Sequence, residues 1–261
     1  MDDVKAIVLH ECGGPDVLSH EEVPTPQPGP GEALIRVRSV GVNRTLDITI
    51  RAGEYPRPVA FPHVLGADPA GVVEAVGADV AGLDRGQRVA VFGGLSCGRC
   101  RYCVEGHDED CVNRRYLGVH QWGGYAQYVV APATVVFPIP DDLPFADASF
   151  IFRHFPTAFG QLEASADVQP GETVLVMGAS GGLGLCAIQV AKLVGARVIA
   201  AAGGDERLEV AASFGADFTV NYRREDLAAR VMEMTEGKGV EVVCENVGDP
   251  HLWQGAFNSL A

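Results

Sequence analysis

The sequence has no apolar run long enough to cross a membrane. A membrane-spanning helix needs about 20 consecutive apolar residues, and no such stretch occurs among the 261 residues. The opening MDDVKAIVLH holds one short apolar run, residues 6–9, which is too short for a secretory signal. We therefore expect a cytoplasmic protein that has no membrane partner and whose thiols stay reduced.

Positive charge is also scarce. The chain carries 20 Lys and Arg against 34 Asp and Glu, a net charge of −14, and no long run of basic residues. A nucleic-acid partner requires a basic surface that releases counterions from phosphate. We therefore exclude nucleic acid as a partner and assign the acidity to solubility.

The sequence has no internal repeats and no low-complexity segments. The pattern of its first 140 residues predicts short strands separated by glycine and proline. Several segments alternate apolar and polar residues or form short β-branched runs, as strands do. They are EALIRVRSVGV, AGVVEAVG, GQRVAVF and AQYVVAPATVVFPIP. Together they predict a compact β-rich domain over residues 1–140.

Beyond Pro140 the pattern changes to alternating strands and helices. DDLPFADASFIF predicts a helix, and Gly171 begins a series of strand–helix units. The expected strands are TVLVMG, RVIAA, FTVNY and GVEVVCEN. The expected helices are residues 182–194 closed by Gly195, DERLEVAASFG capped by Asp205 and stopped by Gly215, and EDLAARVMEMT. This order predicts a parallel sheet with helices on both faces over residues 141–261.

A glycine-rich turn joins the first of these strands to its helix. The spacing Ala179-x-Gly181-x-x-Gly184 is the dinucleotide fingerprint with alanine at its first position. Gly181 would let backbone approach a pyrophosphate, Gly184 would let the helix pack on the sheet, and the helix N-terminus favours phosphate. The alternative is a structural tight turn. We predict cofactor-binding residues at Thr157, Ala179, Ser180, Gly181, Gly182, Leu183, Gly184, Arg207 and Tyr222.

The end of the second strand bears on which dinucleotide binds. NAD-selective sites place an acid there for the ribose hydroxyls, whereas this chain has Ala202 and Gly203. Cations that suit a 2′-phosphate follow at Arg207 and in the segment NYRR, which contains Tyr222, Arg223 and Arg224. We therefore predict NADP(H). The alternative is that Arg207 lies on a solvated helix face and Asp205 binds the ribose.

Four of the seven cysteines follow the spacing C-x2-C-x2-C-x7-C, in a lobe at about residues 93–115. Clustered thiols in a reducing compartment predict a metal site and not disulfides. Four thiolates satisfy tetrahedral zinc and leave no open position, so we predict one structural zinc per chain. An iron–sulfur cluster and free thiols are the alternatives. The predicted ligands are Cys97, Cys100, Cys103 and Cys111, and the other cysteines, Cys12, Cys186 and Cys244, are expected to be buried.

This lobe, followed by a nucleotide fold, resembles the medium-chain dehydrogenase/reductase superfamily. Segments similar to family segments recur in the expected order along essentially the whole chain. They are GPGEALIRVRSVGVN, PHVLGADPAGVVEAVG, GQRVAVFG, GGYAQYVV and GETVLVMGASGGLG. The resemblance implies a GroES-like catalytic domain followed by a Rossmann domain, hence an α/β plus β-rich fold and an NAD(P)H-dependent oxidoreductase with a small-molecule substrate.

The zinc alcohol dehydrogenases of this family hold a catalytic zinc, and its ligands are not matched here. Asn43 and Ala67 stand where the family's Cys and His are implied, and Arg153 stands about where the third ligand falls. Alanine and arginine offer no lone pair, and asparagine is a poor zinc ligand. Asp68 and His154 remain as ligands, too few for a site with three protein ligands.

Without a catalytic zinc, the chain resembles the quinone oxidoreductases and acryloyl-CoA-type reductases of the family. That resemblance implies hydride addition to an activated C=C bond or a quinone, with hydrogen-bond donors stabilising the developing oxyanion. Asn43 or Arg44 would polarise the substrate oxygen, Arg153 would stabilise an oxyanion or bind a carboxylate, and His154 would relay a proton. Alternatively, Arg153 only pairs with Asp68 or Asp47, and His154 is a core histidine.

Two other functions stay open: a zinc alcohol dehydrogenase with shifted ligands, and a non-catalytic nucleotide-binding redox sensor. The family resemblance also implies roughly eighty further residues, so the chain would be a truncated form, a split enzyme or a degenerate product. In the strand order 3-2-1-4-5-6, GVEVVCEN would then be an open edge. We expect a homo-oligomer, or a second chain that completes the Rossmann fold.

Overall fold

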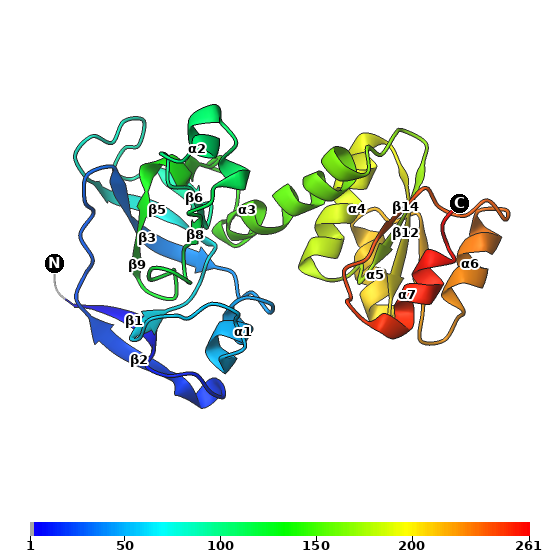
Figure 1. Ribbon diagram of the computed structural model, residues 1–261, viewed down its shortest axis with the longest axis horizontal. Coiled ribbons are helices and arrows are strands. Elements are labelled where there is room, and N and C mark those ends of the chain that lie inside the picture. The colour runs from blue at the N-terminus through cyan, green and yellow to red at the C-terminus, as the bar shows by residue number, and fades with distance from the viewer. Residues whose placement is uncertain (1–2) are drawn as a thin grey trace. The chain divides into compact units, whose positions relative to one another are not determined.

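The computed structural model describes residues 3–261, which form two compact units. The first unit ends at Arg153 and the second begins at His154, so α3 (Phe145–Phe159) contributes to both (Figure 1). The predicted boundary after residue 140 precedes α3 and stays a prediction. Within residues 3–261, no helix combines the length and the apolar composition needed to cross a bilayer.

The first unit is built mainly from antiparallel strands. A five-stranded sheet has the order β10-β6-β5-β3-β9, and a three-stranded sheet has the order β2-β1-β4. The strands are β1 (Val4–Leu9), β2 (Leu18–Val23), β3 (Glu32–Val40), β4 (His63–Val64), β5 (Pro69–Val76), β6 (Arg88–Val91), β9 (Tyr128–Pro132) and β10 (Val136–Pro138). Short helical segments connect them: η1 (Pro15–Val17), α1 (Asp47–Ala52) and η3 (Ala133–Val135).

The alternation of the sequence sets the core of this unit. Ala33 and Ile35 of β3 point to one face, where they pack with Val73 of β5 and Val129 of β9. Gly71 of β5 faces the backbone of β3 so closely that an added Cβ would lie 2.1 Å from the carbonyl oxygen of Arg36. The strand segments expected from the sequence are therefore confirmed, and glycine is required where β3 and β5 approach each other.

A small lobe leaves the five-stranded sheet after β6. The two-residue strands β7 (Gly94–Leu95) and β8 (Arg115–Tyr116) pair antiparallel and close its base. Between them lie α2 (Arg101–Glu105) and η2 (Asp108–Asp110), and α2 ends at Gly106 in the left-handed conformation. The lobe therefore holds residues 97–111 as one closed loop.

The second unit is a parallel four-stranded sheet in the order β13-β12-β11-β14. It comprises β11 (Thr173–Met177), β12 (Arg197–Ala202), β13 (Phe218–Asn221) and β14 (Val242–Cys244), after the π-helical turn η4 (Gly160–Ser165). The helices are α4 (Gly182–Val194), α5 (Asp205–Ser213), α6 (Leu227–Met234) and α7 (Pro250–Phe257). Core residues of α4 and α5 cover one face of the sheet, and those of α6 and α7 cover the other (Figure 1).

This topology confirms the predicted GroES-like and Rossmann-type fold class. Helix α4 spans 182–194 and ends at Gly195, whose φ of 92° is left-handed, as the sequence predicts. The predicted cap of α5 is wrong: Gly204 is the N-cap, and Asp205 lies in the first turn. The expectation for Cys12 is also wrong, because this side chain is exposed, whereas Cys186 and Cys244 are buried.

Candidate functional site

The four clustered cysteines lie together in the lobe between β7 and β8. Their sulfur atoms all fall within 4.8 Å of one another. Cys97 Sγ lies 4.0 Å from Cys103 Sγ, which lies 3.4 Å from Cys100 Sγ. Zinc bound to four thiolates at about 2.3 Å separates the sulfurs by about 3.8 Å. The donor set therefore fits a tetrahedral metal of the zinc type with no position left for substrate.

Local donors favour the thiolate forms of Cys97 and Cys100, whereas burial raises the pKa of Cys103 to about 12. The backbone N–H of Cys97 donates to Cys111 Sγ, and the N–H of Cys100 donates to Cys97 Sγ, at 3.3 and 3.4 Å. Backbone donors at Arg99 and Cys100 lower the pKa of Cys97 to about 6. Thiolates are the form that metals bind. Elsewhere in residues 3–261, no three His, Cys, Asp or Glu side chains come close enough to share a metal ion.

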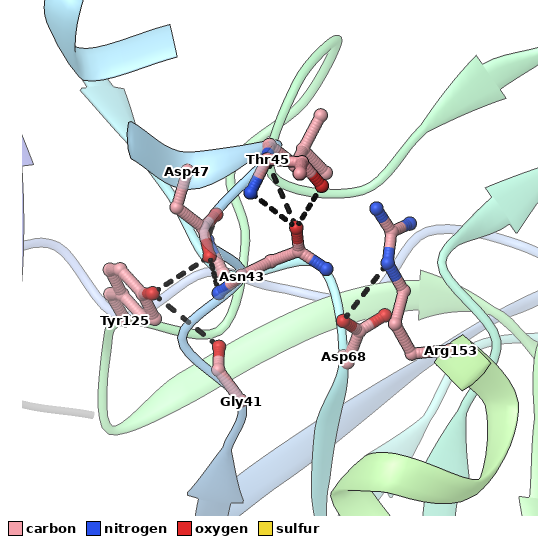
Figure 2. A network of polar contacts seen from close by, with 9 residues as sticks. Gly41, Asn43, Thr45, Asp47, Asp68, Tyr125 and Arg153 are labelled. Carbon is pink, nitrogen blue, oxygen red and sulfur yellow. Dashed lines mark hydrogen bonds and ion pairs between the residues drawn. The ribbon is translucent and has the colours of Figure 1, made fainter. Parts of the chain in front are cut away.

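A second group of polar side chains surrounds the turn before α1. The amide oxygen of Asn43 accepts hydrogen bonds from Thr45 N, Thr45 Oγ1 and Leu46 N at 3.1, 2.9 and 3.0 Å (Figure 2). That oxygen is therefore committed to holding the turn. The amide nitrogen of Asn43 points to the side of the network where Asp68 and Arg153 lie. Asn43 is buried, so it presents an N–H donor from a fixed position.

Asp47 is the anchor of this network. Its carboxylate accepts hydrogen bonds from Asn43 N at 2.7 Å, Tyr125 Oη at 2.9 Å and Gly66 N at 3.3 Å (Figure 2). Gly66 has a φ of 98°, and an added Cβ would lie 2.6 Å from the Tyr125 ring. Burial, followed by the charge of Asp47, raises the pKa of Tyr125, so the phenol stays a donor. Asp47 thus ties α1, the segment before β5 and the segment before β9 together.

Asp68 lies in a different environment from Asp47. Its side chain is 6% exposed, and Arg153 Nε lies 3.9 Å from its Oδ2, which is longer than a hydrogen bond (Figure 2). Within residues 3–153, no hydrogen bond is donated to this carboxyl group. Burial raises its pKa to about 6, the charge of Arg153 opposes that rise, and the charge of Asp47 adds to it.

The structure therefore brings four of the six predicted catalytic residues together: Asn43, Asp47, Asp68 and Arg153. Arg44 is exposed beside them in sequence. His154 follows Arg153 in α3 and is the first residue of the second unit. The ion pair between Arg153 and Asp68, one of the predicted alternatives, is present. Its N···O distance of 3.9 Å is too long for a hydrogen bond, so the N–H groups of Arg153 can still bind another partner.

The glycine loop of the second unit fits a dinucleotide. Gly181 is the N-cap of α4, with Gly182 and Leu183 in the first turn. An added Cβ at Gly184 would lie 2.4 Å from the carbonyl oxygen of Gly178 and 2.8 Å from Ala179 Cα. The loop therefore needs glycine there for α4 to pack on β11, and it leaves the N–H groups of α4 free for phosphate. Ser180 lies in this loop, and Thr157 is exposed on α3.

The end of β12 carries the residues that bear on the 2′ position of a dinucleotide. A Cβ added at Gly203 would lie 2.9 Å from Arg223 Nε and 3.1 Å from Tyr222 Cε2. Asp205 is engaged with Arg224 and accepts a hydrogen bond from Asn221 Nδ2 at 2.6 Å. Arg223 and Tyr222 therefore lie over the backbone of Gly203, while the nearby acid is neutralised by a cation.

Sequence reasoning missed three groups. Tyr125 binds Asp47 across 78 positions of sequence, and nothing in its own segment marks it. Arg223, named in the sequence but not chosen, lies at Gly203, whereas the chosen Arg207 is exposed on α5. Asn246, which follows β14, donates to Met177 O, and its amide oxygen is buried with no partner in the described part of the chain. A polar residue just after a parallel strand is the signal that could have found it.

Comparison with known proteins places these sites in context. Residues 29–141 match the alcohol dehydrogenase GroES-like domain, and residues 182–261 match the zinc-binding dehydrogenase model. The chain is 37% identical over 234 residues to an alcohol dehydrogenase of Schizosaccharomyces pombe, covering 89% of this chain and 66% of the relative. It is 32% identical over 250 residues to the quinone oxidoreductase of Pongo abelii, covering 95% and 68%.

A solved structure agrees with these sequence relatives. The crystal structure of an NAD-dependent alcohol dehydrogenase superposes with a TM-score of 0.94 at 42% identity, covering 98% of this chain and 74% of that one. The chain thus spans about two thirds to three quarters of the length of the relatives it matches. The matches include both alcohol dehydrogenases and a quinone oxidoreductase. They therefore identify an oxidoreductase but do not identify its substrate.

Proposed function

The chain belongs to the medium-chain dehydrogenase/reductase family of oxidoreductases, and from this membership we propose that it is an NADPH-dependent reductase of an activated C=C bond or a quinone that works without a catalytic zinc. One observation carries the proposal. Arg153 lies beside Asp68, in the segment where the family resemblance implies a catalytic metal ligand. When bound, the reduced nicotinamide supplies a hydride.

The donor set around Asp68 supports zinc-independent chemistry. Arg153 has no lone pair to offer a metal, and the amide oxygen of Asn43 is already bound by Thr45 and Leu46. Ala67 cannot ligate. An Arg guanidinium and an Asn amide group instead supply N–H donors, which stabilise negative charge as it develops on a substrate oxygen.

The residues of the network take separate roles in this proposal. Asn43 Nδ2 and the terminal nitrogens of Arg153 bind and polarise the substrate carbonyl oxygen. Asp47 holds Asn43 in place because its carboxylate accepts a hydrogen bond from the backbone N–H of Asn43. His154 relays protons, and exposed Arg44 guides an anionic substrate. The donors are held by packing and hydrogen bonds before substrate arrives, which is what oxyanion stabilisation requires.

We assign the cysteine lobe a structural zinc. Its four thiolates would complete the coordination of the ion, so this metal would fold the lobe and take no part in the chemistry. The fit of the sulfur positions supports the assignment.

For the cofactor we propose NADP(H), held by the loop from Ala179 to Gly184 and by Thr157. Arg223 and Tyr222 over Gly203 would receive the 2′-phosphate, and Arg207 would add positive charge from α5. The pairing of Asp205 with Arg224 supports this choice, because an acid held in an ion pair is less able to accept the ribose hydroxyls of NAD.

Zinc-dependent alcohol oxidation is the second candidate, because relatives named alcohol dehydrogenases match the chain. Asp68 and His154 would then be shifted ligands. In the described part of the chain β14 is an edge strand of its sheet, which supports the expectation of a homo-oligomer or of a second chain that adds a strand. Light scattering on the purified protein measures that association directly.

The test is an assay of NADPH and NADH consumption with an enone, a quinone and acryloyl-CoA, beside oxidation of a simple alcohol. The proposal predicts turnover of at least one activated acceptor, preference for NADPH, and no oxidation of the alcohol. Alcohol oxidation that is lost on chelation and restored by zinc would establish the second candidate instead. NADPH binding with no turnover of any acceptor would favour a nucleotide sensor.

A further inference from the structure

Two buried carboxyl groups lie in one network of the first unit and have opposite surroundings. Asp47 accepts three hydrogen bonds, from Asn43 N, Tyr125 Oη and Gly66 N. Asp68 is equally buried, and within residues 3–153 it has only the distant guanidinium of Arg153. Hydrogen bonds to a carboxylate favour its charged form, and burial without them favours the neutral acid. Of the two groups, Asp68 is therefore the one suited to hold a proton.

From this contrast we propose that Asp68 is the proton donor of the reaction, delivering its carboxyl proton to the α-carbon of an activated C=C substrate. The inference rests on the proposed reductase function. Asp47 is a positioning residue, because both of its carboxylate oxygens accept hydrogen bonds, which hold Asn43, Tyr125 and Gly66 in place.

The reduced nicotinamide, when bound, would supply a hydride to the β-carbon of the substrate, where a C–H bond would form as the π electrons of the C=C bond move toward the carbonyl oxygen. The N–H groups of Asn43 and Arg153 stabilise that oxygen. Asp68 then gives its proton to the α-carbon, the oxygen's electron pair returns, and the C=O bond re-forms. Asp68 is left as a carboxylate beside Arg153 and takes its next proton from water.

The geometry around Asp68 supports both states of this cycle. The neutral acid suits a buried side chain that receives no hydrogen bond from residues 3–153. The carboxylate formed by proton transfer meets the positive charge of Arg153 at 3.9 Å. Figure 2 shows the terminal nitrogens of Arg153 directed away from Asp68, so they can serve the substrate oxygen while Nε faces the acid.

Within residues 3–153, the titratable groups that face Asp68 are Arg153 on α3, Asp47 on α1 and Tyr125 before β9. Burial raises the pKa of Tyr125, so its phenol stays neutral in the working range of pH. Burial raises the pKa of Asp68 to about 6, so the acid form declines above that pH. Turnover limited by this proton should therefore fall about tenfold for each pH unit above 6.

The first experiment needs no turnover. Aspartate carboxyl carbons labelled with 13C are followed by NMR as pH changes in wild-type protein and in Asp68→Asn, which identifies the Asp68 signal. We expect that signal to titrate near pH 6. Titration near the ordinary value for aspartate would overturn the proposal, whatever the activity of the protein.

The second experiment measures where the proton comes from. The purified protein reduces 2-methylcyclohex-2-enone with NADPH, and the product is resolved by chiral chromatography. Wild type should give one enantiomer of 2-methylcyclohexanone. Asp68→Asn should lower kcat about 100-fold, remove the pH dependence above 6 and give nearly racemic ketone. Asp68→Glu should restore part of the rate and selectivity.

The controls separate this proposal from the proposed function. Asp84→Asn, at an exposed acid of the first unit, should leave rate and selectivity unchanged. An Asp68→Asn protein that keeps the rate, the pH profile and the single enantiomer would refute the proton donor while leaving the reductase function intact. Wild-type protein that consumes no NADPH with any enone would instead contradict the reductase function, and the NMR titration would still decide the state of Asp68.

Discussion

Arg153 Nε and Asp68 Oδ2 lie 3.9 Å apart in the first unit, one on α3 and the other immediately before β5. Arg153 stands about where the family resemblance implies the third zinc ligand, and Asp68 follows Ala67, which stands where the His ligand is implied. The pair puts a guanidinium and a buried carboxyl group at this place. A cation with fixed N–H donors can stabilise an oxyanion without a metal.

Asp68 should weaken the folded state as pH rises. Its pKa is about 6 in the folded protein against an ordinary value of 3.8, so the folded state binds the proton more tightly. The stability that this proton contributes is fully present below pH about 4 and is lost as pH rises through 6. Asp68→Asn should therefore raise the free energy of unfolding by about 2 to 3 kcal/mol at pH near 8 and change it little near 4.

Urea unfolding of both proteins across this pH range measures the effect. Asp84→Asn is the matched control, since its side chain is exposed. A stability difference that does not vary with pH would mean that Asp68 is ionised at its ordinary pKa.

Arg153→Ala should lower kcat/KM for an enone by about 100- to 1000-fold, the usual effect of removing one donor to an oxyanion. Arg153→Lys should recover part of this loss, because it keeps the charge but not the planar fork. Added guanidinium should rescue the alanine variant. Steady-state kinetics with NADPH measure all three.

Arg85→Ala is the control for Arg153, because Arg85 is an exposed residue that pairs with Glu74. If Arg153→Ala leaves kcat/KM unchanged, Arg153 does not stabilise the oxyanion, and its ion pair with Asp68 is purely structural.

Arg223→Ala should raise the KM for NADPH by about tenfold and leave the KM for NADH unchanged, because a charge-assisted contact to a phosphate is lost. The reason is the position of Arg223 over Gly203. Arg207→Ala tests the residue chosen from sequence. If only Arg207→Ala raises the KM for NADPH, then Arg207 and not Arg223 contacts the 2′-phosphate.

Gly184→Ala should destabilise the second unit and abolish nucleotide binding. Its Cβ would meet the backbone of Gly178 at 2.4 Å, and backbone cannot move aside as a flexible side chain does. Such overpacking costs about 1 to 3 kcal/mol. Gly160→Ala is the control, since an added Cβ there meets nothing within 4 Å. Thermal melts and NADPH fluorescence titration measure both effects, and tight binding by Gly184→Ala would contradict the packing argument.

The parts of the fold that depend on local sequence were predictable. The bounds of α4 follow from its glycine start and from Gly195, whose left-handed conformation ends the helix. The cysteine cluster was also predictable, because its four ligands lie within one short loop and their spacing is visible in the sequence. In both cases the interacting residues are near neighbours along the chain.

The parts that depend on distant partners were not predictable. Asp205 was expected to cap α5, but Asn221 and Arg224, from β13 and the turn after it, take its carboxylate. The contrast between Asp47 and Asp68 depends on Tyr125, which comes from far along the chain. Propensity and motif spacing describe one segment at a time, so they cannot show which of two acids will be hydrogen-bonded after folding.

The zinc content of the purified protein tests the central claim most directly. It should be measured by mass spectrometry of the metal in wild type and in a Cys100→Ser, Cys103→Ser double variant, beside the rate of enone reduction in wild type. The account predicts one zinc per chain in wild type, none in the variant, and enone reduction by wild type with that single ion. Two zinc ions per chain, with one retained in the variant, would contradict it.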